Sequence, residues 1–137
     1  MFEKFNFSKK QIETYYKSAI KDYKIAKDSD VPEVVFHFCY NSLIKLAISI
    51  CSENSLRVKS RQGHHIELIE KLSKYLDDEE ILTIGNEMRS KRNWDLYGGG
   101  IIISKKSAQE YLLWVKNILN KSQKYLDDKN SKLKLNI

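Results

Sequence analysis

Apolar residues recur every three or four positions along most of the chain, which is the spacing of one face of an α-helix. The clearest stripe predicts a helix near the C-terminus that Ser104 or Ser107 caps. Its members are Ala108, Tyr111, Leu112, Val115, Ile118, Leu119, Ser122 and Leu126. No long segment alternates between apolar and polar residues, so no strand is predicted.

The same period predicts four further helices. The first follows Ser8, a favoured N-cap residue, and covers about 9–27. The second covers about 32–53 and has its proline in the first turn, where a helix tolerates it best. It is apolar on nearly all sides, so we expect it at the centre of the fold. Two more are expected over about 64–76 and 80–97, the latter opened by acidic residues that favour a helix N-terminus.

These elements predict an all-α protein. Helices joined by short connections pack as antiparallel neighbours, so we expect an up-and-down antiparallel bundle of four to five helices. A chain of 137 residues is long enough for one hydrophobic core and too short to suggest two. A single domain is therefore expected over 1–137, with 127–137 as a frayed tail.

The composition, 42% hydrophobic and 31% charged, is that of a globular protein. The apolar runs fall short of a membrane span and the N-terminus has no apolar signal segment, so we expect a cytoplasmic protein with no membrane partner. Cys39 and Cys51 would lie about 18 Å apart on one helix, too far to form a disulfide, and are expected to be buried thiols. No ligand spacing suggests zinc, and neither a metal nor a cofactor is expected.

The net charge of +6 suggests a polyanionic partner, but all except four of the 24 basic residues are lysines. Because the chain is also rich in Ile and Asn, we attribute the bulk charge to a compositional bias. The scarce arginines are more informative, since a guanidinium group offers a planar fork for phosphate. They are Arg57, Arg61, Arg89 and Arg92, all between positions 57 and 92 of the chain.

The end of the fourth predicted helix brings two of these arginines together with an asparagine. Residues three and four apart are neighbours on a helix, so Arg92 falls in the same stripe as Ile81 and Met88 and should be partly buried. A partly buried arginine needs a partner, and Arg89, Arg92 and Asn93 could together hold a phosphodiester. Alternatively, the two cations only complement the dipole at the helix C-terminus and are solvated.

Three nearby side chains are further candidates. Tyr97 stands five positions after Arg92, and its hydroxyl could bond a bound phosphate, or the residue could simply pack with a solvated tip. The adjacent His64 and His65 point about 100° apart on a helix, so they cannot readily chelate one metal ion. His65 is expected to be a satisfied core histidine, whereas His64 is either structural or faces the basic loop around Arg61 and reaches a ligand.

Together these features resemble the HEPN family, small helical domains named for higher eukaryotes and prokaryotes nucleotide-binding. The resemblance extends from the first helix to about Leu126. It rests on the apolar helix 34–51, the segment Arg-Gln-Gly-His-His over 61–65, and the segment Arg-Ser-Lys-Arg-Asn-Trp-Asp-Leu-Tyr over 89–97. Many family members are metal-independent ribonucleases of toxin–antitoxin or other defence systems, with a motif of an arginine, a polar residue, a few others and a histidine. Arg92 and Asn93 match its start, and Tyr97 stands where the histidine is expected.

The resemblance implies a homodimer whose two motifs face each other across a shared cleft, with RNA or a nucleotide as ligand. In the first hypothesis the protein is a metal-independent ribonuclease, in which Arg92 and Arg89 stabilise the pentavalent phosphate. Asn93 would then orient the motif, and Tyr97 would substitute weakly for the missing histidine. Further phosphate contacts would come from Arg89 and from the two residues Arg61 and His64.

The alternative hypothesis is a noncatalytic helical partner or binding module for a separate nucleotidyltransferase protein, as some relatives are. It would keep the arginines for anion binding only. The missing histidine favours this alternative, because no histidine follows His65 in the chain, whereas the intact pair of Arg92 and Asn93 favours the enzyme. A third interpretation is a helical protein with no ligand.

Overall fold

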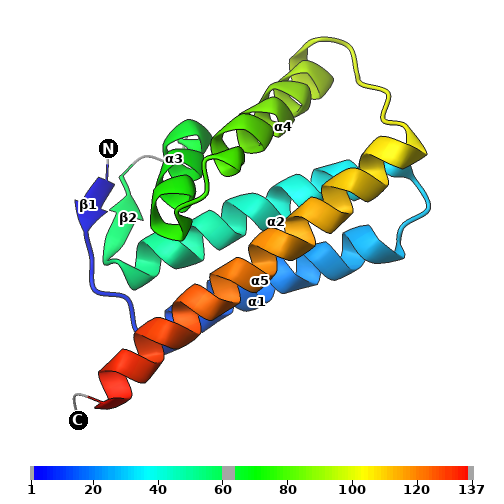
Figure 1. Ribbon diagram of the computed structural model, residues 1–137. Helices are drawn as coiled ribbons and strands as arrows, with labels where there is room; N and C mark the ends of the chain where they lie inside the picture. The colour runs from blue at the N-terminus through cyan, green and yellow to red at the C-terminus, as the bar shows by residue number, and fades with distance from the viewer. Residues whose placement is uncertain (1, 60–63, 136–137) are drawn as a thin grey trace.

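The computed structural model describes the backbone over residues 2–59 and 64–135, and side chains as far as Lys129 (Figure 1). Five helices dominate it, so the predicted all-α class is confirmed. The helices are α1 (Lys9–Asp28), α2 (Pro32–Glu53), α3 (His65–Leu76), α4 (Glu80–Tyr97) and α5 (Lys105–Leu135). Two short strands accompany them, β1 (Phe2–Lys4) and β2 (Leu56–Val58).

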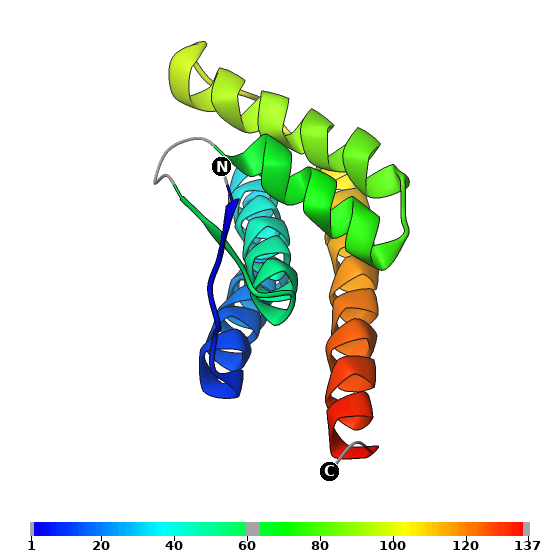
Figure 2. The same ribbon diagram turned by 90° about the vertical axis from the view of Figure 1, so that its left-hand side faces the viewer.

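The helix α2 occupies the centre of this arrangement, as its apolar composition predicts. It contacts each of the other four helices. The long helices α1 and α5 lie along it, while α3 and α4 form an antiparallel hairpin that covers another side (Figures 1 and 2). By length and composition α2 could also cross a membrane, but two thirds of its most apolar window is buried in the protein, as expected of a core helix.

The prediction that the chain contains no strand is wrong for two short segments. The strands β1 and β2 pair antiparallel, with Phe2 opposite Val58 and Lys4 opposite Leu56. Each has only three residues, too few for alternation to be recognised, and their pairing joins segments far apart in the sequence. The basic loop expected after α2 therefore begins as a strand.

Helix starts follow the predicted local signals. The Ser8 side chain accepts a hydrogen bond from the Gln11 amide at 3.1 Å, and the Gln11 side chain accepts one from the Ser8 amide at 2.8 Å. This reciprocal capping box fixes the start of α1. At α5, Ser104 is the capping residue, because its hydroxyl accepts from the Ser107 amide at 3.0 Å.

The far end of α5 extends beyond the expected end of regular structure. Its backbone is helical as far as Leu135, whereas the sequence predicts a frayed tail over 127–137. Fraying is a matter of motion, and it stays a prediction.

Small side chains let α1 and α2 approach closely. Ala19 and Ala26 of α1 are fully buried, and the buried Ser42 hydroxyl donates to the Ala19 carbonyl at 2.8 Å. Cys39 and Cys51 are buried free thiols, as predicted. Burial raises the pKa of each thiol to about 12, so both remain protonated at neutral pH.

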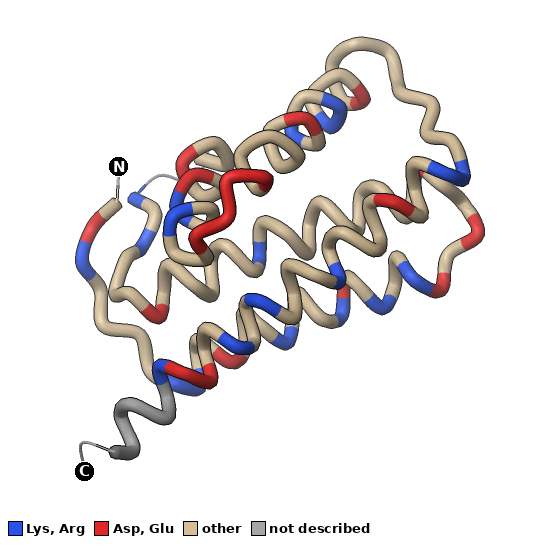
Figure 3. Tube along the Cα trace, viewed as in Figure 1, with Lys and Arg blue, Asp and Glu red and all other residues tan. Residues whose placement is uncertain are grey.

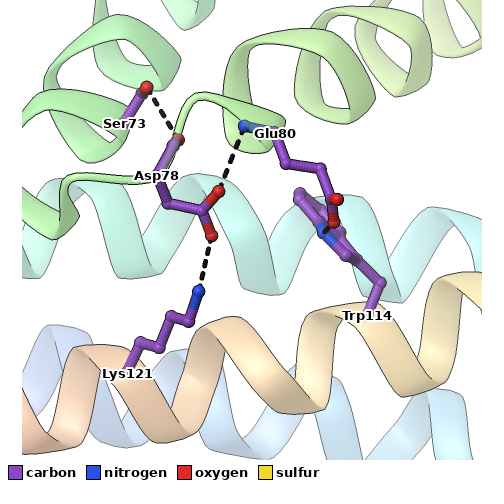
Figure 4. A network of polar contacts seen from close by, with 5 residues as sticks. All are labelled: Ser73, Asp78, Glu80, Trp114 and Lys121. Atoms are coloured by element: carbon purple, nitrogen blue, oxygen red, sulfur yellow. Dashed lines mark hydrogen bonds and ion pairs between the residues drawn. The ribbon is translucent and has the colours of Figure 1, made fainter.

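The turn between α3 and α4 is tied to α5 by a polar network (Figure 4). Asp78 accepts from the Glu80 amide at 3.1 Å and pairs with Lys121 of α5 at 2.7 Å. Its carbonyl accepts from the Ser73 hydroxyl at 2.9 Å, and the Trp114 indole donates to the Glu80 carboxylate at 2.9 Å. This network fixes the start of α4. It therefore also helps to fix the position of the arginines that this helix carries.

Candidate functional site

The inner face of α4 determines where Arg92 lies. Ile81, Gly85 and Met88 on this face are buried. At Gly85 the helix runs so close to α3 that an added Cβ would lie 2.9 Å from Cγ2 of Ile69. Arg92 comes one turn after Met88 and is half-buried, so its predicted partial burial is confirmed.

Arg92 meets two aromatic residues from other helices. Its guanidinium carbon lies 5.8 Å from the centre of the Tyr40 ring, a cation–π distance. Tyr40 is on α2 and only 1% exposed, and its hydroxyl lies 2.8 Å from Nδ1 of His65, the first residue of α3. Arg89, one turn before Arg92, acts electrostatically on both Tyr40 and His65. We call these four residues the arginine cluster.

Burial, together with the charges of the cluster, keeps its histidine neutral. Burial, and next the charges of Arg92 and Arg89, lower the pKa of His65 below its ordinary value. Burial raises the pKa of Tyr40 to about 12, although the same two guanidinium groups act to lower it. At neutral pH the cluster therefore holds two cations, an uncharged imidazole and a protonated phenol.

The hydrogen bond between Tyr40 and His65 also decides which imidazole nitrogen carries the proton. Among the described residues, the buried Tyr40 hydroxyl has no partner other than Nδ1 of His65. The hydroxyl is satisfied as a donor if it donates to Nδ1, which leaves the proton of the neutral imidazole on Nε2. His65 then keeps an N–H donor on Nε2, within the electrostatic influence of the two guanidinium groups.

Neither arginine of the cluster has a carboxylate partner among the described residues. In contrast, Arg57 of β2 pairs with Glu3, and Lys91 pairs with Glu87 at 3.2 Å. Basic positions toward the C-terminal end of α4 are visible in Figure 3. Because Arg89 and Arg92 are half-buried and close together, an anion would relieve both their repulsion and their incomplete solvation.

Of the two other predicted site residues on α4, Asn93 lies beside Arg89 and Tyr97 turns away from the cluster. Asn93 is half-buried, one turn after Arg89. Tyr97 is 86% exposed and lies about 140° around the helix from Arg92 by the helical period. Such high exposure also contradicts the alternative prediction that Tyr97 is a packing residue with a solvated tip. The structure thus brings Arg89, Arg92 and His65 together but does not bring Tyr97 to them.

The remaining predicted phosphate contacts are His64, which faces an acidic side chain, and Arg61. His64 is half-buried, with Nδ1 3.6 Å from the Glu67 carboxylate, so its charged neighbour is an acid. Arg61 falls outside the described residues. Arg57, in the same basic segment, is held by Glu3 and lies 4.2 Å over the Phe5 ring.

A second cluster that the sequence reasoning missed anchors the end of α4. One carboxylate oxygen of Asp95 lies 2.6 Å from Nε2 of His37 on α2. The other accepts a hydrogen bond from the Ile101 amide at 3.0 Å, beyond the glycines. Gly99 and Gly100 both have positive φ, which lets the chain turn back toward Asp95. The position of Asp95 shortly before a run of glycines was the available signal.

Tyr40 was also missed as part of the site. It lies within the apolar run of α2, where a tyrosine is predicted to be an ordinary core residue. Its place beside His65 follows only from the packing of α3 against α2. His65 itself was expected to be a satisfied core histidine; one ring nitrogen does contact Tyr40 at 2.8 Å, but the residue is half-buried rather than part of the core.

The described residues contain no group of three or more His, Cys, Asp or Glu side chains placed to hold a metal ion. Comparisons with protein-family models, with curated proteins and with solved structures find no match to this chain. Any functional conclusion therefore depends on the arginine cluster itself.

Proposed function

We propose that this protein binds RNA or nucleotides through the arginine cluster, as a HEPN-like dimer of a toxin–antitoxin or defence system. The observation that carries the proposal is the pair Arg89 and Arg92, both half-buried and without a carboxylate partner among the described residues. Phosphate oxygens accept paired N–H bonds from guanidinium groups and would neutralise the cluster. A cytoplasmic location is part of the same proposal.

Binding without cleavage is the form of the proposal that the geometry favours. Cleavage needs a base for the ribose 2′-hydroxyl, and the exposed Tyr97 lies away from Arg92. In His65, Nδ1 is engaged by Tyr40, and when the Tyr40 hydroxyl donates to it the imidazole proton lies on Nε2, which leaves neither nitrogen free to take another. We therefore favour the noncatalytic module, which could serve a separate nucleotidyltransferase protein, over the ribonuclease.

The homodimer in this proposal draws support from exposed apolar side chains. Trp94, Leu96, Tyr97 and Ile102 are all exposed, and all belong to the end of α4 or the connection that follows. Exposed apolar side chains near a candidate site are typical of an interaction surface. A second copy of the chain covering the end of α4 would bring two arginine clusters near each other.

The test compares wild-type protein with Arg92→Ala, using a labelled single-stranded RNA in buffer with a chelator. We expect Arg92→Ala to weaken binding at least about tenfold, since a charge-assisted bidentate contact is lost. Arg57→Ala is the matched control, because that arginine is already paired with Glu3 and should leave binding nearly unchanged.

The same samples distinguish binding from cleavage on a denaturing gel. Intact RNA together with Arg92-dependent binding supports the module. Cleavage that disappears in Arg92→Ala would instead support the ribonuclease. Equal binding by wild type and Arg92→Ala would contradict the proposed function in both forms.

A further inference from the structure

We infer that the arginine cluster takes a phosphate monoester, the terminal phosphate of a nucleotide or of an RNA end, in preference to an internal phosphodiester. This inference rests on the proposed function and narrows its ligand. It follows from the charge of the cluster, from the donors that it offers, and from the helix end on which His65 lies.

The charge of the cluster matches a dianion better than a monoanion. Arg89 and Arg92 contribute two positive charges with no carboxylate partner among the described residues. A phosphodiester carries one negative charge, whereas a monoester carries about 1.5 to 2 at pH 7. A bound diester would leave one guanidinium group uncompensated in a half-buried position, and a bound monoester would balance both.

The donors of the cluster match the three terminal oxygens of a monoester. Arg89 and Arg92 each present a fork of N–H groups, and His65 adds Nε2–H when the Tyr40 hydroxyl donates to its Nδ1. These donors come from two different helices, α4 and α3. A group with three acceptor oxygens can engage all three side chains, whereas a diester has only two unesterified oxygens.

The N-terminus of α3 adds to the same field. His65 is the first residue of this helix, and the N-cap residue His64 makes no side-chain hydrogen bond to the first turn. Amide groups at a helix N-terminus favour anions, most strongly those of higher charge. The cluster thus combines two guanidinium groups, an imidazole N–H and a helix N-terminus.

The experiment uses two single-stranded RNA oligomers of identical sequence and 3′ label, one with a 5′-phosphate and one with a 5′-hydroxyl. We expect the phosphorylated oligomer to bind at least about tenfold more tightly at pH 7. Arg92→Ala should abolish that preference, Arg92→Lys should retain part of it, and the paired Arg57→Ala should leave it intact. Thermal melts of each variant verify that it is folded.

A parallel calorimetric titration with AMP and with adenosine identifies the source of the phosphate. AMP binding with no preference between the oligomers assigns the site to free nucleotides, and a preference between the oligomers without AMP binding assigns it to RNA ends. Equal, Arg92-dependent binding of the two oligomers, with no binding of AMP, would overturn the monoester inference and leave the proposed function standing. No binding of any of these ligands would overturn both.

Discussion

His65 illustrates how neighbours set the chemistry of a single side chain. Its pKa is lowered by burial, Arg92 and Arg89, so the folded protein binds this proton less readily than the unfolded chain, whose histidines titrate near about 6.5. Below about pH 6.5 the unfolded state therefore binds more protons, and stability is lost as the pH falls toward the folded pKa.

We accordingly expect the melting temperature of the wild type to fall between pH 7.5 and pH 5.5 by more than that of His65→Gln. Gln is chosen because its amide can still accept a hydrogen bond from Tyr40. His37 and His64 are present in both proteins, so their contributions cancel in the comparison. Parallel curves for the two proteins would show that His65 is not the group responsible.

Asp22 is a buried charge whose partner can be removed. Its carboxylate is nearly inaccessible and lies 2.6 Å from Nζ of Lys45, which is itself partly exposed. Lys45→Met keeps the aliphatic packing but leaves the carboxylate without its cation, and should lower the free energy of unfolding by about 1–3 kcal/mol. Urea denaturation measures the loss. Adding Asp22→Asn should restore part of it, and no change in either variant would mean that solvent already screens the pair.

At the scale of elements, the close approach of α3 and α4 depends on Gly85. Alanine is about 1 kcal/mol better than glycine in a helix interior. Its Cβ would nevertheless lie 2.9 Å from Cγ2 of Ile69, so we expect Gly85→Ala to destabilise the protein by about 1–2 kcal/mol. Chemical denaturation tests this. Ile69→Leu, which has no methyl on Cβ, should relieve the clash in the double variant, and a stabilising Gly85→Ala would refute the packing argument.

The end of α4 depends on Asp95 in a similar way. Asp95→Ala removes the acceptor of the Ile101 amide and the partner of His37. We expect the Ile101 amide to lose its protection from hydrogen exchange, while the amides in the middle of α2 keep theirs. Unchanged protection at Ile101 would show that other contacts hold this connection.

The helices were predictable because their signals are local. Ser8, Pro32 and Ser104 mark helix starts within three or four residues of sequence, and the structure uses all three in that way. The pairing of β1 with β2 was not predictable, because each partner is short and their contact is distant in sequence. The partial burial of Arg92 was predictable from helical spacing alone, whereas its meeting with Tyr40 depends on how three helices pack together.

At the scale of the whole molecule, the exposed apolar side chains at the end of α4 predict self-association. The chain has a mass of 16.1 kDa, and light scattering after gel filtration should give twice that value. Leu96→Asp places a charge among these exposed residues and should yield the monomer without unfolding it, because Leu96 is not part of the core. A monomeric wild type would remove the dimer from the proposal and leave the cluster to act alone.

The two consecutive helices α4 and α5 meet only through side chains in the described part of the chain, since none of their Cα atoms approach within 8 Å of each other. Tyr111 of α5 bridges to Glu87 and Lys91 of α4, and Trp114 bonds to Glu80. The two tryptophans of the chain thus stand on either side of this separation, Trp94 in solvent and Trp114 at the bridge. If the α3–α4 hairpin tilts relative to α5 when a ligand binds, the intrinsic tryptophan fluorescence of the protein should therefore change.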